Sequence, residues 1–375
     1  MKFFNAGRYI QQGHYESFEP ELIHRPWELS DPKIIMLLSK ADRHLGRLDM
    51  YSGYIPNIDL FISMHVAKEA TQSSRIEGTQ TRIEEALMDR ESVPSEKRED
   101  WEEVQNYMKA MDYAIKELEA LPFSSRLIRK THQVLMQGVR GQYKQPGEFR
   151  KSQNWIGGST ISKASFIPPV HEHVPTLMGD LEKFMHDEDI QLPDLIKIAI
   201  MHYQFETIHP FLDGNGRVGR LLITLYLVSC GILKEPILYL SDYFEKNRID
   251  YYDRLMRVRK NNDLSGWIQF FLEGVVETAS SGIETFDAIL QLQKELEEKI
   301  QTLGPRFGNA QKVVNYLYRR PLISAEQVRE AVDVSMPTAY KLINALEDLN
   351  IIREVTGYER NRLYIFDDYV RIFVT

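Results

Sequence analysis

The sequence has very little cysteine, since Cys230 is the only one among 375 residues. An internal disulfide is therefore excluded, and a reducing compartment is permitted. Cys230 lies at the end of an apolar run, directly before Gly231. We therefore expect it to be a buried packing residue rather than a reactive thiol.

Long hydrophobic runs are also missing. The most apolar stretch, residues 221–233, is interrupted by Gly231 and followed by Lys234 and Pro236. It is shorter than the ~20 residues that a membrane-spanning helix needs. Residues 1–8 lack the apolar region and cleavage pattern of a signal peptide. We expect a cytoplasmic protein with no membrane partner.

An excess of positive charge is absent too. The chain has 46 Lys and Arg against 54 Asp and Glu, a net charge of -8 and a pI near 5.8. This argues against a chain devoted to nucleic acid or anionic membranes, although one domain could carry a local basic face. The length and ordinary composition predict two or three domains.

What the sequence does contain is one dense polar stretch, residues 209–220, with the sequence HPFLDGNGRVGR. Residues 214–216 (GNG) tolerate positive φ, so their N–H groups can form an anion nest that opens onto the N-terminus of an apolar helix. Arg217 and Arg220 are three positions apart and share one face of that helix. Two guanidinium groups in this arrangement suit a polyphosphate.

Two further residues of the stretch carry chemistry. Asp213 is a hard oxygen ligand that can hold Mg²⁺ against phosphates. His209 is the only nearby group able to accept a proton near neutral pH. The pattern indicates a nucleotide transferase. The structural alternative is a glycine-rich turn between helices with solvent-exposed arginines, since glycine motifs alone are weak.

Residues 209–220 resemble the H-x-F-x-[DE]-G-N-G-R-x-x-R motif of the Fic (filamentation induced by cAMP) family at every specified position. The resemblance implies transfer of AMP from ATP to a Ser, Thr or Tyr hydroxyl of a protein, the chain itself included, with release of pyrophosphate. It implies that His209 is the general base, Asp213 the Mg²⁺ ligand, and Arg217 and Arg220 the β/γ-phosphate ligands. The remaining motif residues assigned to ATP are Gly214, Asn215, Gly216, Val218 and Gly219.

A second motif, Ser73-x-x-x-Glu77-Gly78, follows a helix expected over residues 58–75. Gly78 suits the left-handed position that often follows a helix. Without a family resemblance, the local sequence favours a solvent-exposed Glu77. The stretch resembles the [ST]-x-x-x-E-[GN] inhibitory motif of Fic proteins. The resemblance implies an inhibitory helix whose Glu77 reaches the ATP site and pairs with Arg220.

Residues 155–169 combine β-branched and aromatic side chains around two glycines, which predicts a hairpin that ends at Pro168-Pro169. In the family this position is the flap, and its exposed edge holds a protein substrate by strand addition. We assign Ile156 and Phe166 to that edge. The alternative is a surface hairpin that binds no protein substrate.

Residues 237–255 also resemble Fic cores. The resemblance implies that Asn247 bonds the nucleoside and that Tyr252 and Leu255 form an apolar or stacking wall; the alternative is that the tyrosines are core. His202, within the apolar helix expected over residues 192–208, is interpreted as a satisfied core histidine.

The C-terminal part has a different pattern. Helices over 313–319, 324–332 and 337–349, followed by strands at 351–354 and 362–366, resemble a winged helix-turn-helix. Exposed Thr338, Tyr340 and Lys341 and the wing residues Arg360 and Arg362 could contact a partner. Acidic residues interrupt the basic ones, so a DNA partner and a protein partner both stay open.

The sequence thus predicts a mainly α fold, with a helical Fic core, a β-hairpin flap and a C-terminal winged helix. We expect an irregular N-terminal arm within an inhibitory helical region at 1–110, the catalytic core at 111–275, a linker helix at 276–304 and a separable winged helix at 305–375. The cofactors are ATP and Mg²⁺, and a homodimer stays open. The alternatives are transfer of another nucleotide or phosphate-containing group, removal of AMP, or a winged-helix regulator whose Fic site senses nucleotide.

Overall fold

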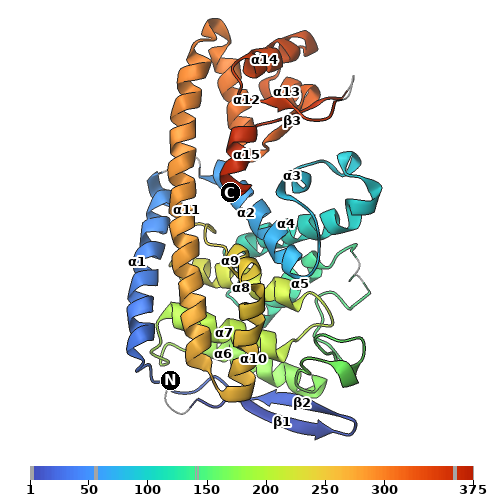
Figure 1. Ribbon diagram of the computed structural model, residues 1–375, viewed down its shortest axis with the longest axis vertical. Coiled ribbons are helices and arrows are strands. Elements are labelled where there is room, and N and C mark those ends of the chain that lie inside the picture. Colours follow the sequence, from blue (N-terminus) through green and yellow to red (C-terminus); the bar gives the residue numbers. More distant parts are fainter. Residues whose placement is uncertain (1–3, 55–57, 140, 142, 358–360, 375) are drawn as a thin grey trace.

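The computed structural model describes residues 4–54, 58–139, 141, 143–357 and 361–374, and it is mainly helical, as the sequence predicts (Figure 1). Its helices are α1 (Pro32–Tyr54), α2 (Asp59–Ile76), α3 (Ile83–Ala86), α4 (Arg98–Leu118), α5 (Ser125–Leu135), α6 (Val174–His186), α7 (Asp194–Ile208), α8 (Asn215–Ser229), α9 (Ser241–Lys246), α10 (Arg248–Asn261), α11 (Leu264–Gln301), α12 (Phe307–Arg319), α13 (Ala325–Val332), α14 (Met336–Asp348) and α15 (Asp367–Val374). The strands are β1 (Gly7–Gln12), β2 (Tyr15–Pro20), β3 (Leu322–Ser324), β4 (Arg353–Glu354) and β5 (Leu363–Ile365). Within the described residues, no helix combines the length and hydropathy that a bilayer crossing needs.

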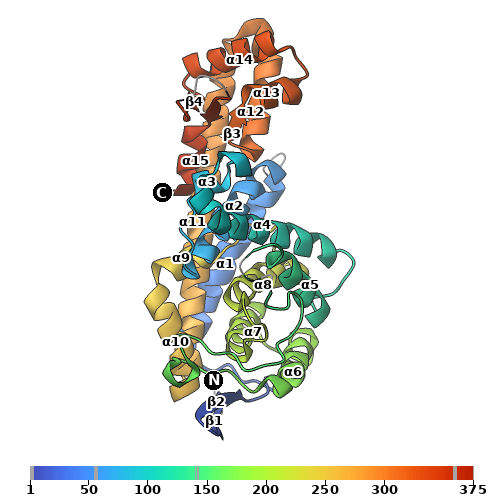
Figure 2. The same cartoon turned by 90° about the vertical axis from the view of Figure 1, so that its right-hand side faces the viewer.

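Helices α7 and α8 form the centre of the helical core. Every residue of α7 from Leu195 to Ile208 is buried, and so is most of α8. A helix that is buried on every side belongs in the interior of a large core. The two helices pack on each other and are surrounded by α5, α6 and α11 (Figure 2). The loop that joins them, residues 209–214, is therefore anchored at both ends.

Helix α11 is 38 residues long and connects this core to the C-terminal elements (Figure 1). Helix α1 packs along it. The boundary that we expected at residue 276 falls inside α11, so the linker helix continues without a break from the core.

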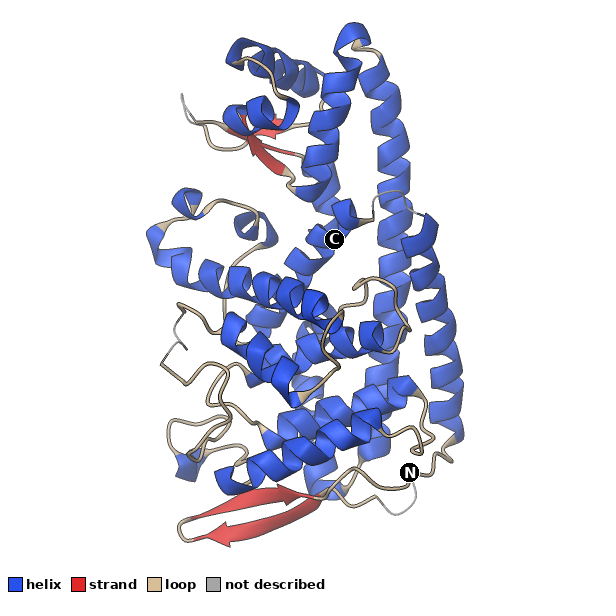
Figure 3. Cartoon of the chain, turned by 180° about the vertical axis from the view of Figure 1, so that it is seen from behind, coloured by secondary structure: helices blue, strands red, loops and turns tan. Residues whose placement is uncertain are grey.

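The N-terminal segment is not an irregular arm, in contrast to our prediction. Strands β1 and β2 form an antiparallel hairpin, from Gly7 opposite Pro20 to Gln12 opposite Tyr15 (Figure 3). Gly13, at φ +64°, allows the tight turn between them. Phe18 anchors the hairpin, because its side chain is fully buried against Phe166. Pro20 ends the second strand instead of preventing it.

Cys230 is exposed, which corrects the prediction that it is a buried packing residue. Helix α8 ends at Ser229, and Cys230 is its C-cap. The end of α8 therefore emerges from the core, which the composition of the apolar run could not reveal.

The C-terminal elements follow the order expected from the sequence. Strands β3, β5 and β4 form one antiparallel sheet beside α12, α13 and α14 (Figure 3). Ser324 caps α13, since its Oγ accepts from the Gln327 N–H at 3.2 Å. Asp333 turns the chain between α13 and α14 at φ +56°. The wing residue Arg360 lies outside the described residues.

The C-terminal elements share a core with α2. Phe61 of α2 packs against Tyr318 of α12 and Tyr369 of α15, with ring centroids 5.1 and 6.3 Å apart. His65, one turn further along α2, packs edge-on against Phe373 of α15 at 5.0 Å. Removal of the C-terminal elements would therefore uncover one face of α2.

Candidate active site

The loop from α7 to α8 is shaped by two left-handed residues. His209 caps the C-terminus of α7 at φ +50°, and Gly214 caps the N-terminus of α8 at φ +74°. Asn215 closes the loop between them. Its Oδ1 accepts from the Phe211 N–H at 2.8 Å, and its Nδ2 donates to the Phe211 carbonyl at 2.9 Å. The loop is therefore rigid without a strand or disulfide to support it.

The N-terminus of α8 provides the anion site. Its first backbone bond runs from the Val218 N–H to the Gly214 carbonyl at 3.0 Å, so the N–H groups of residues 215–217 precede the hydrogen-bond ladder. Free N–H groups and the helix dipole favour an anion there. Among residues 214–216 only Gly214 has positive φ. The site is thus a helix N-terminus rather than the nest of successive left-handed residues that we expected.

Arg220 is bound by the end of α2. Its Nε donates to Ser73 Oγ at 2.9 Å, and its Nη2 donates to the Ser73 carbonyl at 2.8 Å and to Glu77 Oε1 at 2.6 Å. The Arg220 side chain is 1% exposed, whereas that of Glu77 is 35% exposed. Loss of water around Glu77 would raise the pKa of its carboxyl, but the charge and hydrogen bond of Arg220 outweigh this and hold the pKa below its usual value.

The carboxylate of Glu77 also lies directly against the helix N-terminus. A Cβ placed on Gly216 would be only 2.2 Å from Glu77 Oε1. A side chain at residue 216 would therefore displace the Glu77 carboxylate from this position. The same position is where an anion bound by α8 would be expected, since it adjoins the first-turn N–H groups.

Arg217 has its own carboxylate partner, which sequence reasoning missed. Its Nη1 donates to Glu103 Oε2 on α4 at 3.0 Å, and its Nη2 lies 3.9 Å from Asp213 Oδ1. Both Arg217 and Glu103 are buried. Each motif arginine is thus matched by a glutamate from a different helix of the N-terminal part. No local pattern marks Glu103, which sits in an ordinary charged helix.

Asp213 is placed as a cation ligand would need to be. Its side chain is 47% exposed, and its Oδ1 accepts from the Gly214 N–H at 2.7 Å. The described residues contain no group of three or more His, Cys, Asp or Glu that could enclose a metal ion. Mg²⁺ usually takes one or two carboxylates together with phosphate oxygens and water. A single accessible Asp213 beside an anion site fits that requirement.

His132, which the sequence did not mark as a site residue, packs against the loop of residues 209–214. Its ring stacks on Phe211 with centroids 3.7 Å apart. In the neutral tautomer that fits both contacts, Nδ1 accepts from the Gly147 N–H at 2.8 Å and Nε2 donates to the Asp213 carbonyl at 3.0 Å. Burial lowers the pKa of His132 to about 4, so this tautomer persists at neutral pH.

His209 itself is neutral at physiological pH. Burial and the charges of Arg150 and Arg259 lower its pKa to about 3, while Glu77 opposes them. Its Nδ1 is buried and has no hydrogen-bond partner among the described residues. A neutral imidazole in this position can accept a proton.

The segment expected to form a hairpin flap makes only one isolated bridge, between Ile156 and Phe166. Gly157 and Gly158 both adopt φ +70°, and a 3-10 turn occupies Ile161–Lys163, so extended pairing stops at once. Ile156 is half-buried, but Phe166 is buried beneath Arg259. Of the two residues assigned to a substrate-binding edge, Ile156 remains accessible.

The other assigned residues lie in different settings. Tyr252 is 40% exposed and lies near the Glu77–Arg220 pair. Partial burial and the charge of Glu77 raise the pKa of its hydroxyl, whereas the charge of Arg220 lowers it. Leu255 is buried, and Asn247 Nδ2 donates to the Tyr243 carbonyl at 3.0 Å.

Val218 and Gly219 have packing roles. Val218 is fully buried, and a Cβ on Gly219 would lie 2.2 Å from Glu206 Oε1 on α7, so Gly219 permits close contact of α7 and α8. His202 is a satisfied core histidine, as predicted from the sequence, with bonds to the Gly219 carbonyl and the Tyr251 hydroxyl.

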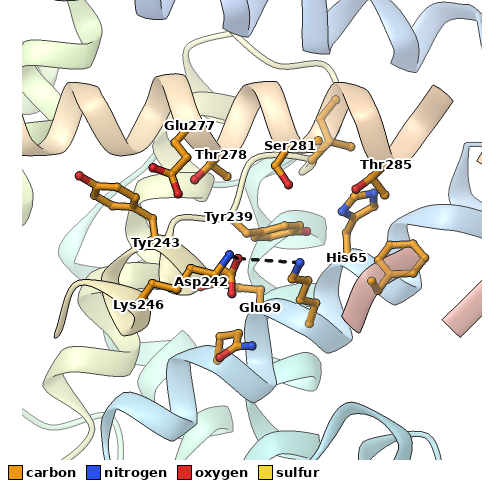
Figure 4. Close-up of a pocket in the computed structure, with 15 residues that line it drawn as sticks. His65, Glu69, Tyr239, Asp242, Tyr243, Lys246, Glu277, Thr278, Ser281 and Thr285 are labelled. Atoms are coloured by element: carbon orange, nitrogen blue, oxygen red, sulfur yellow. Dashed lines mark ion pairs between the residues drawn. The ribbon is translucent and has the colours of Figure 1, made fainter. Parts of the chain in front are cut away.

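A separate polar cavity of about 60 Å³ lies where α2, α9 and α11 meet (Figure 4). Lys68 of α2 and Asp242 of α9 form an ion pair at its edge, with 3.9 Å between Nζ and Oδ2. His65 Nε2 and the Tyr239 hydroxyl are buried there without a hydrogen-bond partner among the described residues. Its size and polarity suit a few ordered waters.

Residues 35–116 match the family model described as Fic/DOC family N-terminal, and residues 122–227 match the Fic/DOC family model. The chain belongs to the Fic/DOC family.

Among curated proteins it is similar to protein adenylyltransferase Fic of Aedes aegypti, with 28% identity over 190 residues, which is 50% of this chain and 34% of the relative. Protein adenylyltransferase Fic of Culex quinquefasciatus is 31% identical over 159 residues, 42% of this chain and 28% of the relative. The matched region thus spans about a third of the length of these relatives.

Solved structures show the same fold. A Fic family protein from Desulfovibrio desulfuricans superposes with a TM-score of 0.58 at 21% identity, covering 91% of this chain and 98% of the other. A Fic domain-containing signaling protein from Bacteroides thetaiotaomicron gives 0.53 at 18% identity, covering 68% of this chain and 97% of the other. The first comparison extends over the C-terminal elements as well as the core.

Proposed function

We propose that this chain is a protein adenylyltransferase that moves AMP from ATP to a Ser, Thr or Tyr hydroxyl of a protein, itself included. One observation carries the proposal: a neutral His209 and an accessible Asp213 flank the N-terminus of α8, whose first N–H groups precede the hydrogen-bond ladder of the helix. A base, a cation ligand and an anion site are thus joined by one short rigid loop. The names of the curated relatives support the same activity.

In the proposed reaction the target hydroxyl loses its proton to His209 while its oxygen forms a bond to the α-phosphorus. The bond from that phosphorus to the bridging oxygen breaks, and pyrophosphate leaves. The N–H groups of residues 215–217 neutralise phosphate charge from a fixed position, which costs no reorganisation during the reaction. Bound phosphates also raise the pKa of His209 and make it a better base.

Asp213 would hold Mg²⁺ together with the phosphates. When bound there, the ion supplies charge neutralisation on the triphosphate. The task of this chain is then to orient Asp213, and the Gly214 N–H and the His132 support do so.

The test is incubation of the chain with α-labelled ATP, followed by mass spectrometry of every labelled product. We expect a mass increase of AMP on a protein hydroxyl. His209→Ala should lose transfer while it still binds ATP, and Asp213→Ala should lose the Mg²⁺ dependence of binding. Transfer by His209→Ala at the parent rate would exclude the mechanism. A product of different mass, or release of AMP from modified protein, would identify another reaction at the same site.

We further propose that the resting chain is autoinhibited by Glu77. Its contacts with Arg220 and Gly216 support this, because they occupy the arginine and the helix N-terminus that a γ-phosphate would need. ATP bound beside Glu77 would then present its α-phosphate out of line with the hydroxyl.

For the C-terminal elements we propose a winged helix that binds a protein rather than DNA. Several of its arginines pair with carboxylates of the same unit: Arg329 with Glu326, and Arg353 with Asp367. A face whose cations are already neutralised releases few counterions on DNA. Titration of labelled duplex DNA at two salt concentrations is the test, and tight salt-dependent binding would reverse the assignment.

A further inference from the structure

The backbone around His209 is bound by a buried arginine that lies shortly before the flap segment in the chain. Arg150 is 2% exposed, and its Nε donates to the His209 carbonyl at 2.9 Å. Its Nη2 donates to the Pro169 carbonyl at 2.5 Å and to the Ile208 carbonyl at 3.3 Å. One guanidinium therefore connects the last carbonyls of α7 to the end of the flap segment.

This contact solves a problem that the helix end creates. The last carbonyls of a helix have no partner within it, and a cation at that end also meets the negative pole of the dipole. His209 adopts a left-handed conformation that is uncommon for a non-glycine residue and is stabilised here by its surroundings. Arg150 supplies the donors, and Asn154 adds a second bond to the His209 carbonyl at 3.2 Å.

A second buried arginine makes the matching contact from α10. Arg259 Nε donates to Thr207 Oγ1 at 3.1 Å, two residues before His209. Its guanidinium also stacks over the ring of Phe166, with 3.8 Å from Cζ to the centroid. It thus links the flap to α7 through side chains, where Arg150 links them through carbonyls.

We propose that Arg150 and Arg259 are a pair of positioning residues that fix the flap segment to the C-terminus of α7 and thereby orient His209 toward the target hydroxyl. This rests on the proposed function, in which His209 is the base. Neither residue touches the reacting atoms. Their effect reaches the reaction through the placement of the base and the bound substrate segment.

The electrostatics agree with this geometry. Burial is the main cause that lowers the pKa of His209, the two arginines lower it further, and Glu77 raises it. The charged and titratable groups that act on His209 therefore come from the chain just before the flap segment (Arg150), from α10 (Arg259) and from the end of α2 (Glu77). Removal of one arginine charge must raise the pKa of His209, since a nearby like charge disfavours the protonated ring.

The experiment uses the full chain carrying Glu77→Gly, with Arg259→Gln and Arg150→Lys as test variants. Arg254→Gln is the matched control, because Arg254 also lies on α10 but bonds Asp250 and the Gly266 carbonyl. For each variant, kcat and KM for ATP are measured, and His209 is followed by NMR titration.

Arg259→Gln should raise the pKa of His209 above that of the Glu77→Gly parent, because a nearby like charge is removed. It should lower kcat about 10-fold with the KM for ATP within about 3-fold, since positioning is lost and nucleotide contacts are not. Arg150→Lys keeps the charge but cannot span the carbonyls, so kcat should fall with little change in the pKa.

Values equal to those of Arg254→Gln in both test variants would overturn the proposal. If Arg150→Lys does not fold, Arg259→Gln decides alone, and Arg259→Lys should restore the pKa. If the Glu77→Gly parent transfers no AMP, the proposed function fails, whereas the His209 titration still decides whether the arginines act on it.

Discussion

Arg220 and Ser73, 147 positions apart in the chain, are joined by two hydrogen bonds, one to the Ser73 hydroxyl and one to its carbonyl. Glu77 therefore provides only one of three contacts between Arg220 and α2. Its removal would leave Arg220 attached to the helix but would free the N-terminus of α8, where the carboxylate lies. Release of the phosphate site and release of the arginine are separate events.

For the inhibitory contact, we expect Glu77→Gly to raise AMP incorporation, including self-modification, by at least about 10-fold. The loss of a charged hydrogen bond of about 2 kcal/mol shifts a two-state equilibrium by this order. Ser73→Ala should raise it less, because the carbonyl bond and Glu77 remain. Arg220→Ala, alone or combined with Glu77→Gly, should stay low since a phosphate ligand is lost. Initial rates of AMP incorporation from labelled ATP provide the comparison. If a folded Glu77→Gly chain incorporates AMP no faster than the parent, Glu77 is not inhibitory.

The second prediction concerns Phe61, which packs between Tyr318 and Tyr369. Phe61→Ala should cost about 3 to 5 kcal/mol, as for other buried aromatic residues, and part of that loss should fall on α2. We expect a lower melting temperature together with higher self-modification, because α2 docks less firmly. Deletion of residues 305–375 should act in the same direction.

Tyr340→Ala is the control for this effect, since Tyr340 is exposed on α14. If Phe61→Ala lowers the melting temperature but leaves the rate of AMP transfer unchanged, then the helical core around α7 and α8 holds α2 in place without the C-terminal elements.

At the flap, Ile156 and Phe166 should behave differently. Ile156→Pro removes the N–H that donates to the Phe166 carbonyl at 2.9 Å. It should lower transfer to an external protein more than it lowers ATP binding, because strand addition needs an ordered edge. Phe166→Ala should affect folding as well, since its ring lies under Arg259. Rates of AMP transfer to a peptide and calorimetric measurement of ATP binding distinguish these effects. If Ile156→Pro lowers transfer and ATP binding equally, the flap segment has only a structural role.

Stability should fall on mild acidification. His65, His202 and His209 have pKa values lowered to about 3, and His132 to about 4, in each case chiefly by burial. In the unfolded chain these rings bind protons near pH 6.5, so between pH 6.5 and about 4 the unfolded state binds more protons. The free energy of unfolding must then decrease as pH falls, by up to about 1.4 kcal/mol per pH unit for each ring.

Glu206 acts in the opposite sense. Burial raises its pKa to about 7, so the folded state binds its proton between pH 4.5 and 7 and its stabilisation is lost as pH rises through that window. We therefore expect a net slope nearer three protons than four. Urea unfolding at several pH values measures it. His202→Gln should reduce the slope by about one proton, and an unchanged slope would contradict the assignment.

The sequence predicts those parts of the site whose members are close together. Residues 209–220 define the loop and both arginines, and the spacing of Ser73, Glu77 and Gly78 marks the second motif. The meeting of Glu77 with Arg220 was expected only through the family resemblance, because no local rule pairs residues so far apart.

Glu103, His132 and Arg150 could not be predicted in the same way. Each is a single polar residue in a segment of ordinary composition, and its role appears only when distant backbone groups are brought beside it. The short extent of pairing in the flap segment has a related cause. Its residues have strand propensity, but two glycines with positive φ interrupt the pairing that propensity alone suggests.

Asn215 and Gly216 have a consequence for how the protein ages. In a mobile chain an Asn-Gly pair deamidates readily, because the glycine nitrogen can attack the side-chain carbonyl and form a succinimide. Here Asn215 Oδ1 and Nδ2 are both bound to Phe211, and Gly216 lies in the first turn of α8. The nitrogen is thus kept from the carbonyl while the loop is closed. Chemical damage at residue 215 should therefore accumulate only during the time that the loop spends unfolded.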